Sequence, residues 1–168
     1  MTTTLQQLNE ADASAFIAAL HGIYEHSPWI PERAALQRPF RNITALKLAL
    51  QKVVTDASRA EQLGLIRAHP ELAGRAAIAG ELTAESTGEQ ARAGLNQCSP
   101  EEFSRLQQLN TDYNARFGFP FIVAVKGLTR ADILAAFQAR LANDPETEFQ
   151  TAIAQIHRIA GFRLADLL

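Results

Sequence analysis

The sequence predicts an all-α protein, a single-domain bundle of about seven or eight helices with one extended apolar segment. Apolar residues recur at the three- and four-residue spacing of a helix face through most of the 168 residues. Several segments begin with the Ser, Thr, Asn or Asp residues that cap helix N-termini. Only residues 119–126 have an extended pattern, and no second segment could pair with them as a strand.

The N-terminal third is predicted to contain two helices separated by a proline-rich loop. Asn9 is a candidate cap for the first helix, which ends at Ser27 because the residue before a proline avoids the helical conformation. Residues 28–40 contain three prolines and are predicted to form a loop. Thr44 is the expected start of the second helix. Its buried face would consist of Leu46, Ala49, Leu50 and Val53.

A third helix is predicted to end just before a histidine. Ser58 and Glu61 have the spacing of a capping box, in which each side chain bonds the other residue's backbone N–H. Pro70 stops this helix near Ala68, because proline lacks the N–H that the helix needs. His69 is therefore expected at a helix exit.

The middle of the chain is predicted to form three further helices, the first of them short. Residues 72–82 are rich in Ala and Gly and suggest a short helix around residues 75–79, and a longer helix is expected over residues 83–95. The sequence SPEE at residues 99–102 gives the strongest start signal, with a serine cap, a proline at the first position and a glutamate that reaches back. Gly118 supplies the C-terminal stop of that helix.

The last two helices also have recognisable starts. Thr129 with Asp132 begins one of them, and Asp144 followed by Pro145 begins the other.

Composition disfavours several classes of function. The 16 basic and 18 acidic residues give a formal net charge of -2, without the positive excess that nucleic-acid binding rewards. The longest apolar run, residues 119–125, is too short to span a membrane. The N-terminus lacks the features of a secretory signal, so a cytoplasmic location is expected. Cys98 is the only cysteine, which leaves no internal disulfide and no thiolate metal site.

The four histidines do not form a metal-binding pattern. His21 and His26 are five residues apart and lie on different helix faces. His157 adjoins Ile153 and Ile156 and is interpreted as a residue at the core boundary. No metal site is expected.

His69 is the best candidate for a general acid or base. Pro70 fixes the chain where the side chain leaves the helix, although a histidine at a helix exit is usually structural. Ser86, Glu89 and Gln90 lie on one helix face and could bind a polar ligand, but Ser86 and Glu89 also fit a capping box.

The extended segment is a third candidate element. A buried extended chain among helices needs partners for its backbone N–H and C=O groups. A ligand rich in amides could provide them. Alternatively, Phe119, Phe121 and Val123 fill the core and side chains or water satisfy the backbone.

These elements together resemble one known family. The quoted motifs are His69–Gly74, the face with Ser86, Glu89 and Gln90, the stretch of Asn110, Tyr113 and residues 117–121, and Arg163-Leu164 with Asp166-Leu167. In this order they resemble the 2-oxo-4-hydroxy-4-carboxy-5-ureidoimidazoline (OHCU) decarboxylase family of urate degradation, and the resemblance covers the whole chain.

The resemblance implies a helical homodimer without a cofactor, which converts OHCU to (S)-allantoin and CO₂. It implies that His69 and Glu89 are catalytic. Arg158 is the alternative to Arg163 on the last helix. The implied substrate-binding residues are Pro70, Ser86, Gln90, Phe121, Val123 and Arg163. The competing interpretation is a non-catalytic helical module that binds another protein.

Overall fold

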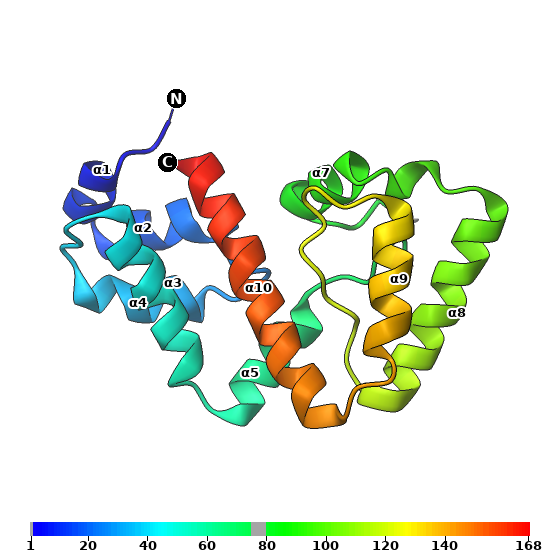
Figure 1. Cartoon of the computed structure of the whole chain (residues 1–168). Coiled ribbons are helices and arrows are strands. Elements are labelled where there is room, and N and C mark those ends of the chain that lie inside the picture. The colour runs from blue at the N-terminus through cyan, green and yellow to red at the C-terminus, as the bar shows by residue number, and fades with distance from the viewer. Residues whose placement is uncertain (1, 75–79) are drawn as a thin grey trace. The chain divides into compact units, whose positions relative to one another are not determined.

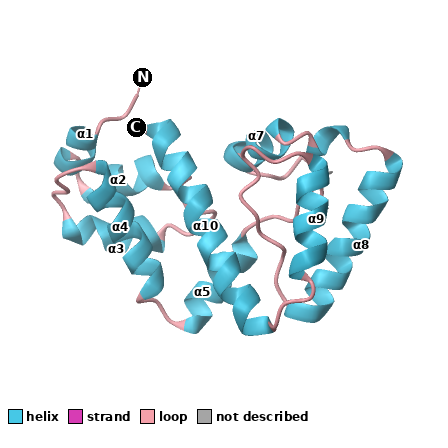
Figure 2. Ribbon diagram, in the orientation of Figure 1, coloured by secondary structure: helices cyan, strands magenta, loops and turns pink. Residues whose placement is uncertain are grey.

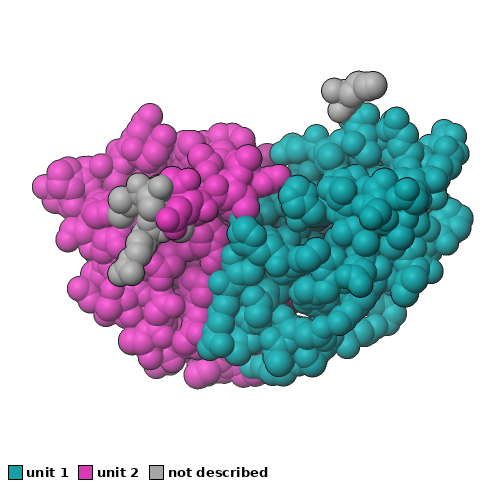
Figure 3. Space-filling view, turned by 180° about the vertical axis from the view of Figure 1, so that it is seen from behind, with its two compact units in different colours: residues 1–68, 157–168 teal, residues 69–156 magenta. Residues whose placement is uncertain are grey.

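The computed structural model describes residues 2–74 and 80–168, and in these ranges the chain forms nine α-helices, two short 3₁₀ helices and no strand (Figure 2). The predicted all-α class is confirmed, with one or two more helices than expected. The predicted short helix at residues 75–79 lies outside the described residues. The chain divides into two compact units, residues 1–68 with 157–168 and residues 69–156 (Figure 3).

The first unit contains the N-terminal helices and the C-terminal turns of the last helix. Its core is apolar and includes the fully buried Phe16, Leu46 and Leu65. The elements are α1 (Leu5–Glu10), α2 (Ala13–Leu20), α3 (Trp29–Ala34), the 3₁₀ helix Ala35–Gln37, α4 (Ile43–Thr55), α5 (Arg59–Ala68) and the end of α10 (Pro145–Leu167) (Figure 1).

The expectation of one first helix capped by Asn9 is wrong. The chain forms two helices, and Asp12 caps the second by accepting a hydrogen bond from the Ala15 N–H at 2.8 Å. Asn9 lies inside α1, and its side chain exchanges two 2.8 Å hydrogen bonds with the backbone of Phe40. The local sequence would assign the Asn9 amide to a helix cap, but this amide instead bonds a residue 31 positions away.

Two other boundaries in this unit differ from the prediction. The proline-rich stretch contains α3, because Pro28 and Pro31 fall before or within the first turn, where a helix N–H has no partner to lose. The cap of α4 is Asn42 rather than Thr44. The predicted capping box of Ser58 and Glu61 is confirmed by two reciprocal hydrogen bonds.

A half-buried histidine links α10 to the chain that follows α2 in this unit. His157 Nδ1 lies 2.8 Å from the Tyr24 hydroxyl, and the two rings meet edge to face. Burial lowers the pKa of His157 to about 4 and raises the pKa of Tyr24. Both side chains are therefore neutral at pH 7, as expected for a histidine at the core boundary.

We expect acid to weaken the fold through His157. An unfolded histidine takes up a proton near pH 6.5, whereas the folded one does so only near pH 4. Between these values the unfolded state binds more protons, so the free energy of unfolding falls as the pH drops, by at most about 3 kcal/mol. Urea unfolding of the wild type and of His157→Gln at pH 4.5 and 7.5 measures this. The difference between the two pH values should be smaller in the variant, and an equal difference would contradict the assignment.

The described residues of the second unit form three complete helices and the start of α10. These are α7 (Ala84–Arg92), α8 (Pro100–Phe117) and α9 (Arg130–Arg140), with a 3₁₀ helix at Leu95–Gln97. The capping boxes predicted at Ser99 and Thr129 are both present. The helix expected over residues 83–95 ends at Arg92, because Gly94 adopts a left-handed φ of 77°.

The course of α8 and α9 explains the extended segment. The two helices lie side by side and run in the same direction, so the chain between them must travel back along their length (Figure 1). An extended chain covers about 3.3 Å per residue, twice the rise of a helix, and makes this return with few residues. Residues 119–125 form it without regular secondary structure, as predicted.

The return segment is held by an aromatic cluster and a buried charge network. Phe121 stacks on Phe137 with ring centroids 3.9 Å apart, and the Tyr113 ring contacts both. The Glu148 carboxylate, fully buried, accepts hydrogen bonds from the Tyr113 hydroxyl at 2.6 Å and from Arg140 Nε. In the described part of the chain, no helix is long and apolar enough to cross a membrane.

Candidate functional site

His69 lies directly after α5, in the position that the sequence predicted. The helix ends at Ala68, and Pro70 follows the histidine and prevents another turn. The His69 side chain is buried, with 7 % of its surface exposed. A buried imidazole whose backbone is restricted on both sides has the fixed orientation that proton transfer requires.

The polar face of α7 is present, and its residues are not caps. Thr83 is the N-cap, and its hydroxyl accepts a hydrogen bond from the Ser86 N–H at 3.2 Å. The alternative of a capping box between Ser86 and Glu89 is therefore wrong. Ser86 and Gln90 are buried and Glu89 is partly exposed, so the face carries a hydroxyl, an amide and a carboxylate.

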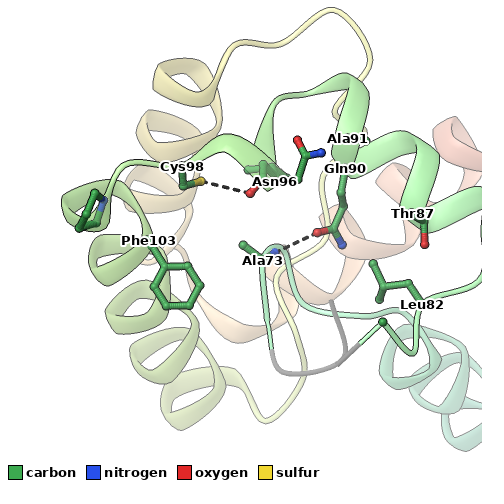
Figure 4. Close-up of a pocket in the computed structure, with 11 residues that line it drawn as sticks. Ala73, Leu82, Thr87, Gln90, Ala91, Asn96, Cys98 and Phe103 are labelled. Carbon is green, nitrogen blue, oxygen red and sulfur yellow. Dashed lines mark hydrogen bonds between the residues drawn. The ribbon is translucent and has the colours of Figure 1, made fainter. Parts of the chain in front are cut away.

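Gln90 also holds the loop that follows His69 and Pro70. Its Oε1 accepts from the Ala73 N–H at 2.9 Å, and its Nε2 donates to Glu71 O at 3.3 Å (Figure 4). Counting the hydrogen bonds among the described residues, one N–H and one lone pair of the amide remain for a ligand.

One edge of the extended segment is bound by side chains. Arg140 donates to Ile122 O, and Gln155 Oε1 accepts from the Ala124 N–H at 2.9 Å. Successive residues of an extended chain point their backbone groups to opposite sides, so those of Phe121 and Val123 point to the other edge. Within the described residues, no hydrogen bond engages the backbone of Phe121 or Val123. That edge can bind a ligand with amide groups.

A model of the OHCU decarboxylase family matches residues 9–165, which include every predicted site residue. The chain belongs to the OHCU decarboxylase family. The protein named 2-oxo-4-hydroxy-4-carboxy-5-ureidoimidazoline decarboxylase in Haloferax volcanii is 45% identical over 163 residues, which are 97% of this chain and 95% of that protein. The Mus musculus protein of the same name is 38% identical and covers 96% and 91%.

Other relatives combine this fold with additional sequence. The uric acid degradation bifunctional protein PucL of Bacillus subtilis is 43% identical over 98% of this chain, which corresponds to 33% of the larger protein. The crystal structure of (S)-allantoin synthase matches with a TM-score of 0.80 and 29% identity, over 99% of this chain and 54% of that one.

An OHCU decarboxylase crystallised with (S)-allantoin shares the fold, with a TM-score of 0.70 and 20% identity over 94% of this chain and 98% of that one.

Seven of the eight residues that the OHCU decarboxylase resemblance selected lie in the unit of residues 69–156. The eighth, Arg163, lies in the other unit. It is 7 % exposed, and its Nη1 donates to Glu25 Oε2 at 2.8 Å and to Gly22 O at 3.0 Å. Arg158 is exposed, with its guanidinium 5.8 Å from the Phe162 ring centroid. Of the two arginines, Arg163 is the buried one.

A cavity of about 580 Å³ adjoins α7 but shares only Gln90 with the predicted site (Figure 4). Most of its lining is apolar, and Figure 4 shows Phe103 and Leu82 among its walls. Cys98 lines it as well. Burial raises the pKa of this thiol, which makes Cys98 a poor nucleophile.

Sequence reasoning missed residues that hold the loop after Pro70. Amide side chains of α8 donate to this loop, in addition to Gln90 of α7. We call the set of Gln90, Gln107, Asn110 and Asn114 the amide clamp. The spacing of three amides at positions 107, 110 and 114 along one face of α8 is the signal that could have indicated it.

The described residues contain no group of three or more His, Cys, Asp or Glu side chains that could hold a metal ion.

Arg140, which was not predicted from the sequence, has a role in positioning the extended segment. Its guanidinium lies 4.4 Å from the Phe121 ring centroid and bonds Ile122 O.

Proposed function

We propose that this protein decarboxylates OHCU to (S)-allantoin and CO₂. Membership of the OHCU decarboxylase family supports the reaction. The observation that carries the proposal is the open backbone edge at Phe121 and Val123, opposite the edge held by Arg140 and Gln155. A flat cyclic ureide with several amide groups is the kind of ligand that such an edge can bind.

The reaction needs proton transfer and a site that holds the ring. When the carbon–carboxyl bond breaks and CO₂ leaves, its electron pair moves into the ring and is taken up by the conjugated imine, whose nitrogen accepts a proton. A proton is then added to the carbon that bears the ureido group, and the 4-hydroxyl loses its proton to become a carbonyl. Because the ring itself accepts the electrons, we propose that no cofactor or metal participates.

His69 is the proposed general acid or base, and it acts on the 4-hydroxyl and carboxylate region. Glu89 has two possible roles, since its carboxylate can destabilise the departing carboxylate or relay the proton that fixes the (S) centre. Ser86, Gln90 and the backbone of Phe121 and Val123 would hold the ring and ureido group. Pro70 would contact the substrate beside His69.

Arg163 is proposed to neutralise an anionic oxygen of the substrate. Its guanidinium lies on a side chain that is 7 % exposed, and a guanidinium forms charge-assisted hydrogen bonds to anionic oxygens. A buried guanidinium also forms stronger bonds to anions than an exposed one.

We also propose that the family domain comprises residues 1–168 and acts as a homodimer in the cytoplasm. The family match extends over residues of both compact units. Leu36, Ile43 and Leu48 are exposed apolar side chains that self-association could cover. The single free cysteine suits a reducing compartment.

The activity can be tested with OHCU generated in situ. Urate is treated with the two preceding enzyme activities, the protein is added, and circular dichroism follows the optically active product. We expect (S)-allantoin to form faster than in the spontaneous reaction, with the same rate in the presence of EDTA. A rate equal to the spontaneous one would exclude the function and favour the non-catalytic module. Inhibition by EDTA would contradict the metal-free mechanism.

A further inference from the structure

We propose that the amide clamp positions His69 for catalysis by immobilising residues 71–73. This inference rests on the proposed function, in which His69 is the general acid or base. None of the α8 members of the clamp is assigned a role by the family resemblance beyond the presence of Asn110 in a motif. We infer that these residues act through the loop and not by contact with the substrate.

Both backbone groups of Ala73 are bound by the amide clamp. Its N–H donates to Gln90 Oε1 at 2.9 Å, and its C=O accepts from Gln107 Nε2 at 2.7 Å. These two partners come from different helices, α7 and α8. Ala73 has a φ of 48°, a left-handed conformation that a residue with a Cβ adopts only at an energetic cost. The two hydrogen bonds hold it in that conformation.

The two preceding residues are bound by α8 as well. Asn110 Nδ2 donates to Leu72 O at 3.1 Å, and Asn114 Nδ2 donates to the Glu71 carboxylate. Gly74 completes a tight turn, because a Cβ at this position would lie 2.7 Å from Glu71 Cβ. The amide clamp therefore binds every residue from Glu71 to Ala73.

A fixed loop at residues 71–73 restricts His69 through Pro70. The proline ring holds its own φ near −65°, and it also restricts the backbone of the residue before it. Only one residue separates His69 from Glu71, so few rotatable bonds lie between the histidine and the clamp. A displacement of about 1 Å at a catalytic group can reduce the rate about 100-fold.

The hydrogen bonding of the Asn110 side chain indicates a role for its donor group, Nδ2. Its side chain is 3 % exposed, and among the described residues its Oδ1 has no hydrogen-bond partner. A buried unpaired acceptor destabilises a fold, so the amide is not optimal for stability at this position. The bond from its Nδ2 to Leu72 O is the interaction that the position provides.

Two substitutions one residue apart on α8 can test the proposal. Gln107→Glu keeps the shape of the side chain but removes the donor to Ala73 O. Gln108→Glu introduces the same charge at an exposed position whose side chain contacts Asp112. We expect Gln107→Glu to lower kcat about 10- to 100-fold with a smaller change in KM, and Gln108→Glu to leave both unchanged.

Two measurements do not depend on activity. Amide hydrogen exchange at Ala73 and Gly74 should become roughly tenfold faster in Gln107→Glu, as expected for one lost hydrogen bond. The NMR titration of the His69 ring should shift relative to the wild type. If the wild type lacks OHCU decarboxylase activity, the proposed function fails, and the His69 titration still tests the clamp.

The proposal would be overturned if Gln107→Glu speeds exchange in the loop while kcat and the His69 titration stay unchanged. If Gln107→Glu does not fold, Asn114→Ala provides the same test at a partly exposed position. We then expect a smaller fall in kcat, of roughly tenfold, together with a shifted His69 titration. Wild-type values for both in a folded Asn114→Ala would overturn the proposal.

Discussion

Replacing His69 with asparagine is expected to lower kcat for OHCU decarboxylation about 10²- to 10⁴-fold, the usual contribution of a positioned general acid or base. Asparagine is polar and of similar size, so it can occupy the buried position after α5, where His69 is 7 % exposed. It cannot take up or release a proton near neutral pH. Binding should be affected less than the rate, because the other proposed substrate contacts remain.

The matched control is His21→Asn, the same chemical change at an exposed histidine. His21 Nδ1 contacts only the Ala18 carbonyl of its own helix among the described residues, so this variant should have the wild-type rate. Far-ultraviolet circular dichroism checks that both variants are folded. Full activity in folded His69→Asn would remove His69 from the mechanism.

Helix starts were predictable where the capping interaction is local. Ser58, Ser99 and Thr129 each bond a residue three positions ahead, and the sequence shows both partners. The break between α1 and α2 was missed although Asp12 also bonds a residue three positions ahead, because Asn9 is by residue type an equally suitable cap. Asn9 bonds Phe40 instead of a nearby N–H, and no local pattern indicates a contact over 31 residues.

The residues of the candidate site likewise divide into those that the sequence indicates and those that depend on the fold. His69 and the α7 face could be identified because a proline and the helical spacing of polar residues are visible in the sequence. The family resemblance contributed Phe121, Val123 and Arg163. The spacing of Gln107, Asn110 and Asn114 places these amides on one face of α8, but their role and that of Arg140 depend on which loop lies against α8 and α9. From sequence alone, Gln107 would be interpreted as an exposed amide. It has a partner only because the fold places the Ala73 carbonyl beside it.

The largest loss of stability is expected from Glu148→Ala. The carboxylate is fully buried and accepts from Tyr113 Oη, Arg140 Nε and Asn143 Nδ2. Its removal leaves the Arg140 guanidinium, with 11% of the side chain exposed, without its compensating charge. Breaking a buried ion pair by removing one partner typically costs about 3–5 kcal/mol. Since total stability for such proteins is only about 5–15 kcal/mol, urea unfolding should show a large shift of the midpoint.

The control is the exposed ion pair of Lys52 and Asp56, four residues apart on α4 and at its end. Lys52→Ala should cost less than about 1 kcal/mol, because water already screens both charges. The double variant Arg140→Met/Glu148→Leu tests the cause. If the cost of Glu148→Ala comes from an uncompensated charge, removing both charges should destabilise the fold less than the sum of the two single substitutions. If the summed cost of the two single substitutions equals the cost of the double variant, the two residues stabilise the extended segment independently. Arg140 would then act through Ile122 O, and Glu148 through Tyr113.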